Sequence, residues 1–153
     1  MVTVDKFTLL PHPARDEPYF WLMESRNVKF GVDAQNRWCA RINDRTVFSS
    51  KVEDCTVLLP LLEIGHDPIH NFLRHTGSMH IELRFVESAF PELLLLQHAL
   101  QGSSYWAERA IDWIANQPLL VAQLREDLQT IINKKMYTQS LRHRAQKMLA
   151  RGA

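Results

Sequence analysis

Five of the seven histidines in this chain lie between positions 66 and 98, and imidazoles gathered in this way can bind a metal or move protons. His66 and His70 have the i, i+4 spacing at which two imidazoles on one helix face share a metal. The dipeptide Asp67-Pro68 argues against this arrangement, because Asp is a preferred N-cap and Pro a preferred first helical residue, which places His66 before the helix. A small enzyme or metal protein centred on His66, His70 and His80 is therefore the third of our hypotheses.

Motifs for other kinds of catalysis are missing from the sequence. His80 and Glu82 have the H-x-E spacing of zinc deaminases, but that family also needs P-C-x-x-C, and no cysteine follows Cys55. The chain contains no H-E-x-x-H, G-x-x-x-x-G-K-S/T, G-x-G-x-x-G or G-x-S-x-G. Cys39 or Cys55 would need a histidine nearby in space to act as a nucleophile, and either is more often a small buried hydrophobic residue. We therefore predict no catalytic, cofactor-binding or metal-binding residue.

Basic side chains gather at the C-terminal end of the chain. Residues 117–153 contain seven Lys and Arg against two Asp and Glu, a net charge of +5, whereas residues 1–116 carry −4. In a helix from about Thr138 to Arg151, the residues at 144, 147 and 151 follow at i, i+3 and i+7 and form one exposed ridge. Such a ridge suits an acidic surface or phosphates, and a merely solvated helix end has the same composition. We predict the following binding residues: Arg142, Arg144, Lys147, Arg151, Lys134 and Lys135.

This charge distribution leads to two hypotheses that rank above the histidine-centred one. The first is a non-catalytic protein–protein interaction module, an adaptor, regulator or inhibitor-type partner, whose basic helix binds an acidic surface of another protein. The second is a nucleic-acid-binding protein that uses the same ridge. It ranks lower because residues 117–153 contain one aromatic residue, Tyr137, and the whole chain has a net charge of only +1.

The elements that must position these residues change character near position 88. Before it, alternating residues predict short strands, and residues 28–32 and 37–42 flank a hairpin loop. Capping signals predict a short helix over 68–75, ended by Gly77. The alternation of apolar and polar residues over 79–85 predicts a half-buried strand.

From Ser88 onward the apolar spacing becomes helical, and the connections are short enough for antiparallel packing. Strands followed by helices argue for the α+β class. We predict one domain over residues 1–153, with 1–87 mainly strands and 88–153 helical. It should consist of an N-terminal antiparallel β-meander followed by a C-terminal antiparallel helical layer of about four helices. The run 55–64 is apolar on all sides and fits either a buried strand or a buried helix.

The composition sets the remaining expectations. A chain of 153 residues that is 46% hydrophobic and 23% charged fits an ordinary globular domain rather than a disordered one. No apolar run approaches the roughly 20 residues of a membrane span, and the N-terminus lacks the pattern of a cleaved secretory signal. Cys39 and Cys55 are too few for a disulfide scaffold. We therefore expect a cytoplasmic protein with two free thiols.

Overall fold

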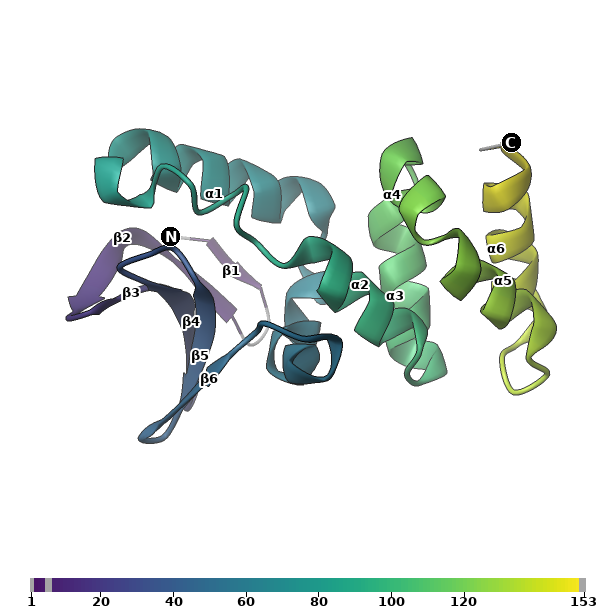
Figure 1. Ribbon diagram of the computed structural model, residues 1–153, viewed down its shortest axis with the longest axis horizontal. Coiled ribbons are helices and arrows are strands. Elements are labelled where there is room, and N and C mark those ends of the chain that lie inside the picture. The colour runs from purple at the N-terminus through teal and green to yellow at the C-terminus, as the bar shows by residue number, and fades with distance from the viewer. Residues whose placement is uncertain (1, 5–6, 152–153) are drawn as a thin grey trace. The chain divides into compact units, whose positions relative to one another are not determined.

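A six-stranded antiparallel sheet forms the N-terminal part of the computed structural model, which describes residues 2–4 and 7–151 (Figure 1). The order of the strands in the sheet follows their order in the chain, so each strand pairs with the next one. This is the predicted antiparallel meander. Its strands are β1 (Val2–Val4), β2 (Phe7–Asp16), β3 (Tyr19–Ser25), β4 (Val28–Asp33), β5 (Trp38–Ile42) and β6 (Arg45–Phe48).

Helices follow the sheet and confirm the α+β class. Among the residues that the structure describes, none of these helices has both the length and the apolar character that crossing a membrane demands. In chain order they are the 3₁₀ helix η1 (Val52–Glu63), α1 (His66–Met79), the 3₁₀ turn η2 (Ile81–Leu83), α2 (Glu92–Leu100), α3 (Ser104–Ile114), α4 (Pro118–Gln123), α5 (Arg125–Asn133) and α6 (Gln139–Arg151).

The chain forms two compact units, and neither is one continuous segment. Unit 1 comprises Met1–Leu58 and Asp67–Pro91, and unit 2 comprises Leu59–His66 and Glu92–Ala153. The chain thus passes from one unit to the other three times. The single domain predicted over residues 1–153 stays a prediction.

In unit 1, α1 lies over the sheet, and aromatic side chains fill the core (Figure 1). The ring of Phe7 on β2 packs against that of Phe30 on β4, with 5.4 Å between centroids. Trp38 on β5 meets Phe90 edge to face at 5.0 Å, and its indole N–H donates to the carbonyl of Val86 at 3.1 Å. Trp38 therefore ties the segment that follows α1 to the sheet.

The helix predicted over 68–75 is longer than predicted and does not end at Gly77. It runs from His66 to Met79, so Gly77 lies inside it and His66 is its first residue. A Cβ atom at position 77 would lie 3.0 Å from the carbonyl oxygen of Leu83. Glycine is therefore needed here for a close approach of two backbones rather than for a positive φ at a helix end.

The strand predicted over 79–85 is wrong. Its backbone groups bond locally: Leu83 N donates to His80 O at 2.9 Å, and Val86 N donates to Leu83 O at 3.0 Å. These are turns of the i, i+3 type. Leu83 is buried, whereas Ile81 and Phe85, which a strand would place on the same face, are exposed. The ambiguous run 55–64 is likewise largely helical, within η1, and contains Pro60.

Unit 2 consists of short helices packed around α3, which contacts α2, α4 and α6, while α5 contacts α2 and α6. The described part of this unit contains five α-helices where we predicted about four, because the predicted third helix is interrupted at Leu124, whose φ of −104° and ψ of 15° separate α4 from α5. The loop between α5 and α6 is tied down by Tyr137, whose buried hydroxyl donates to the carbonyl of Gly102 at 2.9 Å. The core residues of the unit include Leu96, Ala107, Ile111, Leu128, Ile131 and Leu141.

A candidate binding groove on helix α6

The C-terminal half of α6 forms one wall of a groove in unit 2. This groove has a volume of about 380 Å³, and its second wall comes from the end of α3 and from α4. Both of those helices contact α6. Residues 115–116, Pro118 and Val121 line the second wall. We call this feature the α6 groove.

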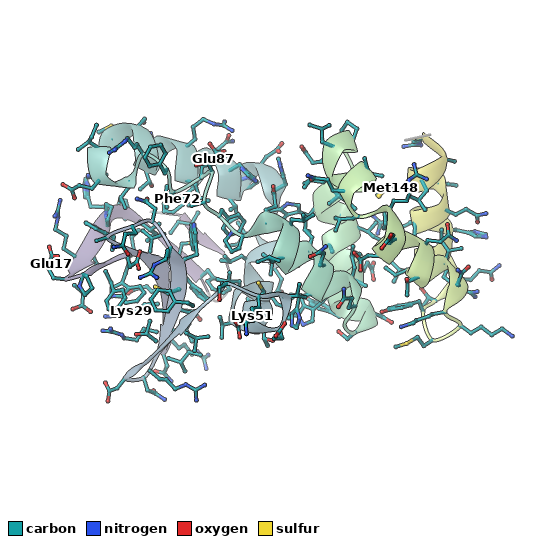
Figure 2. The ribbon with its side chains drawn as sticks, viewed as in Figure 1. Glu17, Lys29, Lys51, Phe72, Glu87 and Met148 are labelled. Atoms are coloured by element: carbon teal, nitrogen blue, oxygen red, sulfur yellow. The ribbon has the colours of Figure 1, made fainter. Side chains whose placement is uncertain are left out.

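Helical periodicity gives α6 a buried face and a groove face. Leu141, Ala145 and Leu149 are one helical turn apart and are buried in unit 2. The groove face lies about a third of a turn away, and Figure 2 shows the side chain of Met148 in the space between α4 and α6. The α6 residues that line the groove are Arg144, Lys147, Met148 and Arg151.

The second wall is shaped by a turn that leads directly into α4. The backbone N–H of Gln117 donates to the carbonyl of Ile114 at 2.9 Å, which closes the turn after α3. Pro118 then begins α4, a position where its fixed φ suits the helix and its missing N–H costs nothing. One turn later Val121 is buried, with 5% of its surface exposed, and presents its methyl groups to the groove. This wall is therefore mainly apolar, with the polar side chain of Asn116 beside it.

The three cations along the groove differ in whether a carboxylate lies beside them. Arg144 donates a hydrogen bond of 2.6 Å to Asp112, and the Nε of Arg109 lies 3.8 Å from the other oxygen of the same carboxylate. Within the described ranges 2–4 and 7–151, no carboxylate lies within ion-pair distance of Lys147 or Arg151. Among the described residues, the groove thus offers one arginine held by an acidic neighbour and two cations without a carboxylate partner.

The structure brings together three of the six predicted binding residues. Arg142 stands two positions before Arg144, about 200° around the helix, and is half-buried away from the groove. Its Nε is buried with no hydrogen-bond partner among the described residues. Lys134 and Lys135 are exposed in the connection between α5 and α6, at the opposite end of α6 from Arg151. The predicted ridge is therefore a cluster of three cations, with the other three dispersed.

The charge spacing along the helix did not predict the apolar partners of this cluster. It placed the three cations on an exposed helix face, but Val121 and Pro118 come from a helix more than twenty positions earlier. Pro118 and the apolar residues after it predict that a helix begins there. They do not predict that this helix packs against α6. No pattern in the sequence indicated that Asp112 pairs with Arg144.

Two histidines of the third hypothesis, His66 and His70, make polar contacts within their own units. In unit 2, the Nε2 of His66 lies 3.8 Å from Glu92, and that carboxylate accepts a 2.9 Å hydrogen bond from the indole of Trp113. The ring of His66 also meets that of Trp113 edge to face, at 5.6 Å. This imidazole thus packs among polar and aromatic side chains of unit 2.

In unit 1, His70 and Arg74 converge on a single carboxylate oxygen. The Nδ1 of His70 and the Nη2 of Arg74 each lie 2.9 Å from the Oε2 of Glu87. His80 follows α1 and lines a small hollow of about 70 Å³ together with Arg15. The His70–Glu87–Arg74 contacts join α1 to the segment that returns along it.

Both cysteines are free thiols buried in unit 1. Burial raises the pKa of Cys39 to about 12 and the pKa of Cys55 to about 11. The thiolate is the nucleophilic form, and a thiol with such a pKa does not form it near neutral pH. These residues therefore behave as small core side chains.

No protein-family model, no curated protein and no solved structure matches this chain.

Proposed function

We propose that this protein is a non-catalytic protein–protein interaction module, an adaptor, regulator or inhibitor-type partner, that binds an acidic surface of another protein through the α6 groove. One observation carries the proposal: three cations on a single face of α6 line a groove whose other wall is mainly apolar. A merely solvated helix face has no need of such a wall. Interfaces commonly combine an apolar centre with a polar rim.

An acidic protein fits this groove better than a nucleic acid does. A nucleic-acid strand presents phosphates at regular intervals and is met by a continuous basic track, with aromatic side chains where bases stack. The α6 groove contains three cations and no aromatic side chain among its lining residues. Lys134 and Lys135 lie at the other end of α6 and do not extend the track. We keep nucleic acid as an outcome of the test.

The test is capture of partners from native lysate, with and without nuclease, followed by identification of what co-purifies. The charge-reversal variant is Lys147→Glu/Arg151→Glu, because neither cation pairs with a carboxylate of the described residues whereas Arg144 is bonded to Asp112. We expect this variant to lose an acidic partner that the native chain captures in nuclease-treated lysate. Lys134→Glu/Lys135→Glu is the matched control, since it makes the same change of charge outside the groove.

Two results would overturn the proposal. Equal loss in both variants would show a non-specific effect of net charge rather than recognition by the groove. Capture that disappears on nuclease treatment would assign the ridge to nucleic acid instead.

We further expect this interaction to take place in the cytoplasm. Cys39 and Cys55 are both unpaired thiols, as a reducing compartment would keep them.

A further inference from the structure

The α6 groove has an apolar part as well as a charged part, and its partner should match both. Val121 and Pro118 form the apolar wall, and Met148 lies between the cations of α6. Methionine is unbranched and adapts its shape to an incoming apolar side chain. A purely ionic partner would leave all of this surface without a contact.

The depth of the groove favours a segment of a protein over a small molecule. Sites for small ligands are enclosed and bury roughly 70–90% of the ligand surface. Here Val121 is the buried member of the apolar wall, while Pro118, Lys147 and Arg151 are exposed. A shallow groove of about 380 Å³ can hold a few side chains of a peptide whose backbone stays outside.

The spacing of Lys147 and Arg151 sets the spacing of the partner's carboxylates. Lys147 and Arg151 are four positions apart on α6, a rise of about 6 Å. Acidic residues at i and i+4 of a second helix have the same rise, and an apolar residue at i+3 lies on the same face of that helix. Such a helix could place two carboxylates on the cations and one apolar side chain between them.

We propose that the α6 groove binds an acidic amphipathic helical segment, with one apolar side chain seated against Val121 and Met148 and two carboxylates paired with Lys147 and Arg151. This inference rests on the proposed function and specifies the chemistry of the partner. The recognition mode is an amphipathic helix laid in a groove, with the usual i, i+3, i+4 anchors.

The probe is the fluorescently labelled peptide Glu-Glu-Leu-Leu-Glu-Glu-Leu-Leu-Glu, and binding to the full chain is measured by fluorescence anisotropy. A second peptide has Gln in place of every Leu, and a third has Gln in place of every Glu. We expect the first peptide to bind at least about tenfold more tightly than either of the others, since a central apolar anchor and desolvated charge pairs each contribute at that scale.

Variants of the protein separate the two contributions. Met148→Gln should weaken the Leu-containing acidic peptide about tenfold and leave the Leu-free acidic peptide unchanged. Leu119→Gln is the matched control, because Leu119 is exposed on α4 but does not line the groove, and it should leave the binding of both peptides unchanged. Lys147→Glu/Arg151→Glu should weaken both acidic peptides. Circular dichroism of each variant confirms that it is folded.

The possible failures differ from one another. If both acidic peptides bind equally and Met148→Gln changes neither, the apolar anchor is wrong, although the acidic partner of the proposed function stands. If Lys147→Glu/Arg151→Glu binds the acidic peptides as well as the native chain does, the proposed function itself is wrong. Tighter binding of a single-stranded oligonucleotide than of any peptide would overturn both.

Discussion

The guanidinium of Arg144 on α6 donates a hydrogen bond of 2.6 Å to the carboxylate of Asp112 on α3. This bond holds the arginine at the edge of the α6 groove and opposes part of its charge. Both side chains are partly exposed, 38% for Arg144 and 49% for Asp112. A pair with this exposure contributes only about 0–1 kcal/mol to stability. Its main effect is therefore on the charge that a partner meets.

Replacing Asp112 by Asn should strengthen binding of an acidic peptide. Asn keeps the size of the side chain and one oxygen acceptor but removes the negative charge that competes for Arg144. We expect a several-fold tighter dissociation constant in the anisotropy titration, with the melting temperature nearly unchanged. Weaker binding would show that Asp112 acts by orienting Arg144 rather than by opposing its charge.

The two buried thiols should make the fold sensitive to alkaline pH. Their pKa values are about 12 and 11 in the folded chain, above the ordinary value of 9.0, so the unfolded chain loses these protons first as pH rises. The stability linked to the neutral thiols is complete below pH 9.0 and is lost as pH rises towards 11 and 12. In that window each thiol contributes a slope of about −1.4 kcal/mol per pH unit to the free energy of unfolding.

Urea denaturation in the presence of a reductant, repeated at rising pH, measures this slope. In Cys39→Ala/Cys55→Ala the free energy of unfolding should decrease less steeply between pH 9 and 11. The two cavities that the substitutions leave lower the stability at every pH and do not change this slope. An unchanged slope in this variant would mean that other groups account for the alkaline sensitivity.

Removing the hydroxyl of Tyr137 should destabilise unit 2 without changing the groove. That hydroxyl donates to Gly102 and is buried, so Tyr137→Phe leaves a carbonyl without its partner. We expect the free energy of unfolding to fall by about 1 kcal/mol. Peptide binding by the folded variant should match that of the native chain, because Tyr137 does not line the α6 groove. A loss of affinity would show that the loop before α6 controls the groove.

A side chain at position 77 should separate α1 from the segment that packs against it. The carbonyl oxygen of Leu83 lies 3.0 Å from where a Cβ atom would stand, and the branched side chain of Val extends further. We expect Gly77→Val to lower the free energy of unfolding by more than about 1 kcal/mol, the range of overpacking in a filled site. Gly102→Val is the control, since the nearest contact of a Cβ atom there is 3.4 Å. Equal effects of the two substitutions would contradict the close approach at Gly77.

Local patterns were enough to predict the meander, the order of strands and helices, and the spacing of Arg144, Lys147 and Arg151 along one helix face. Each of these depends on residues a few positions apart, where side-chain period and charge act directly. The same local rules predicted a strand over 79–85. They failed there because strand identity requires a pairing partner, and the backbone of this segment bonds to itself.

The sequence by itself determined the α+β class and the basic face of α6. Only the tertiary structure decided that this face meets Val121 and Pro118 to form a groove, and that Asp112 holds one of its three cations. It also decided that Arg142, Lys134 and Lys135 lie elsewhere. The reason is physical: the i, i+3, i+7 period positions residues around one helix, whereas the packing of α3, α4 and α6 depends on contacts between residues far apart in the chain.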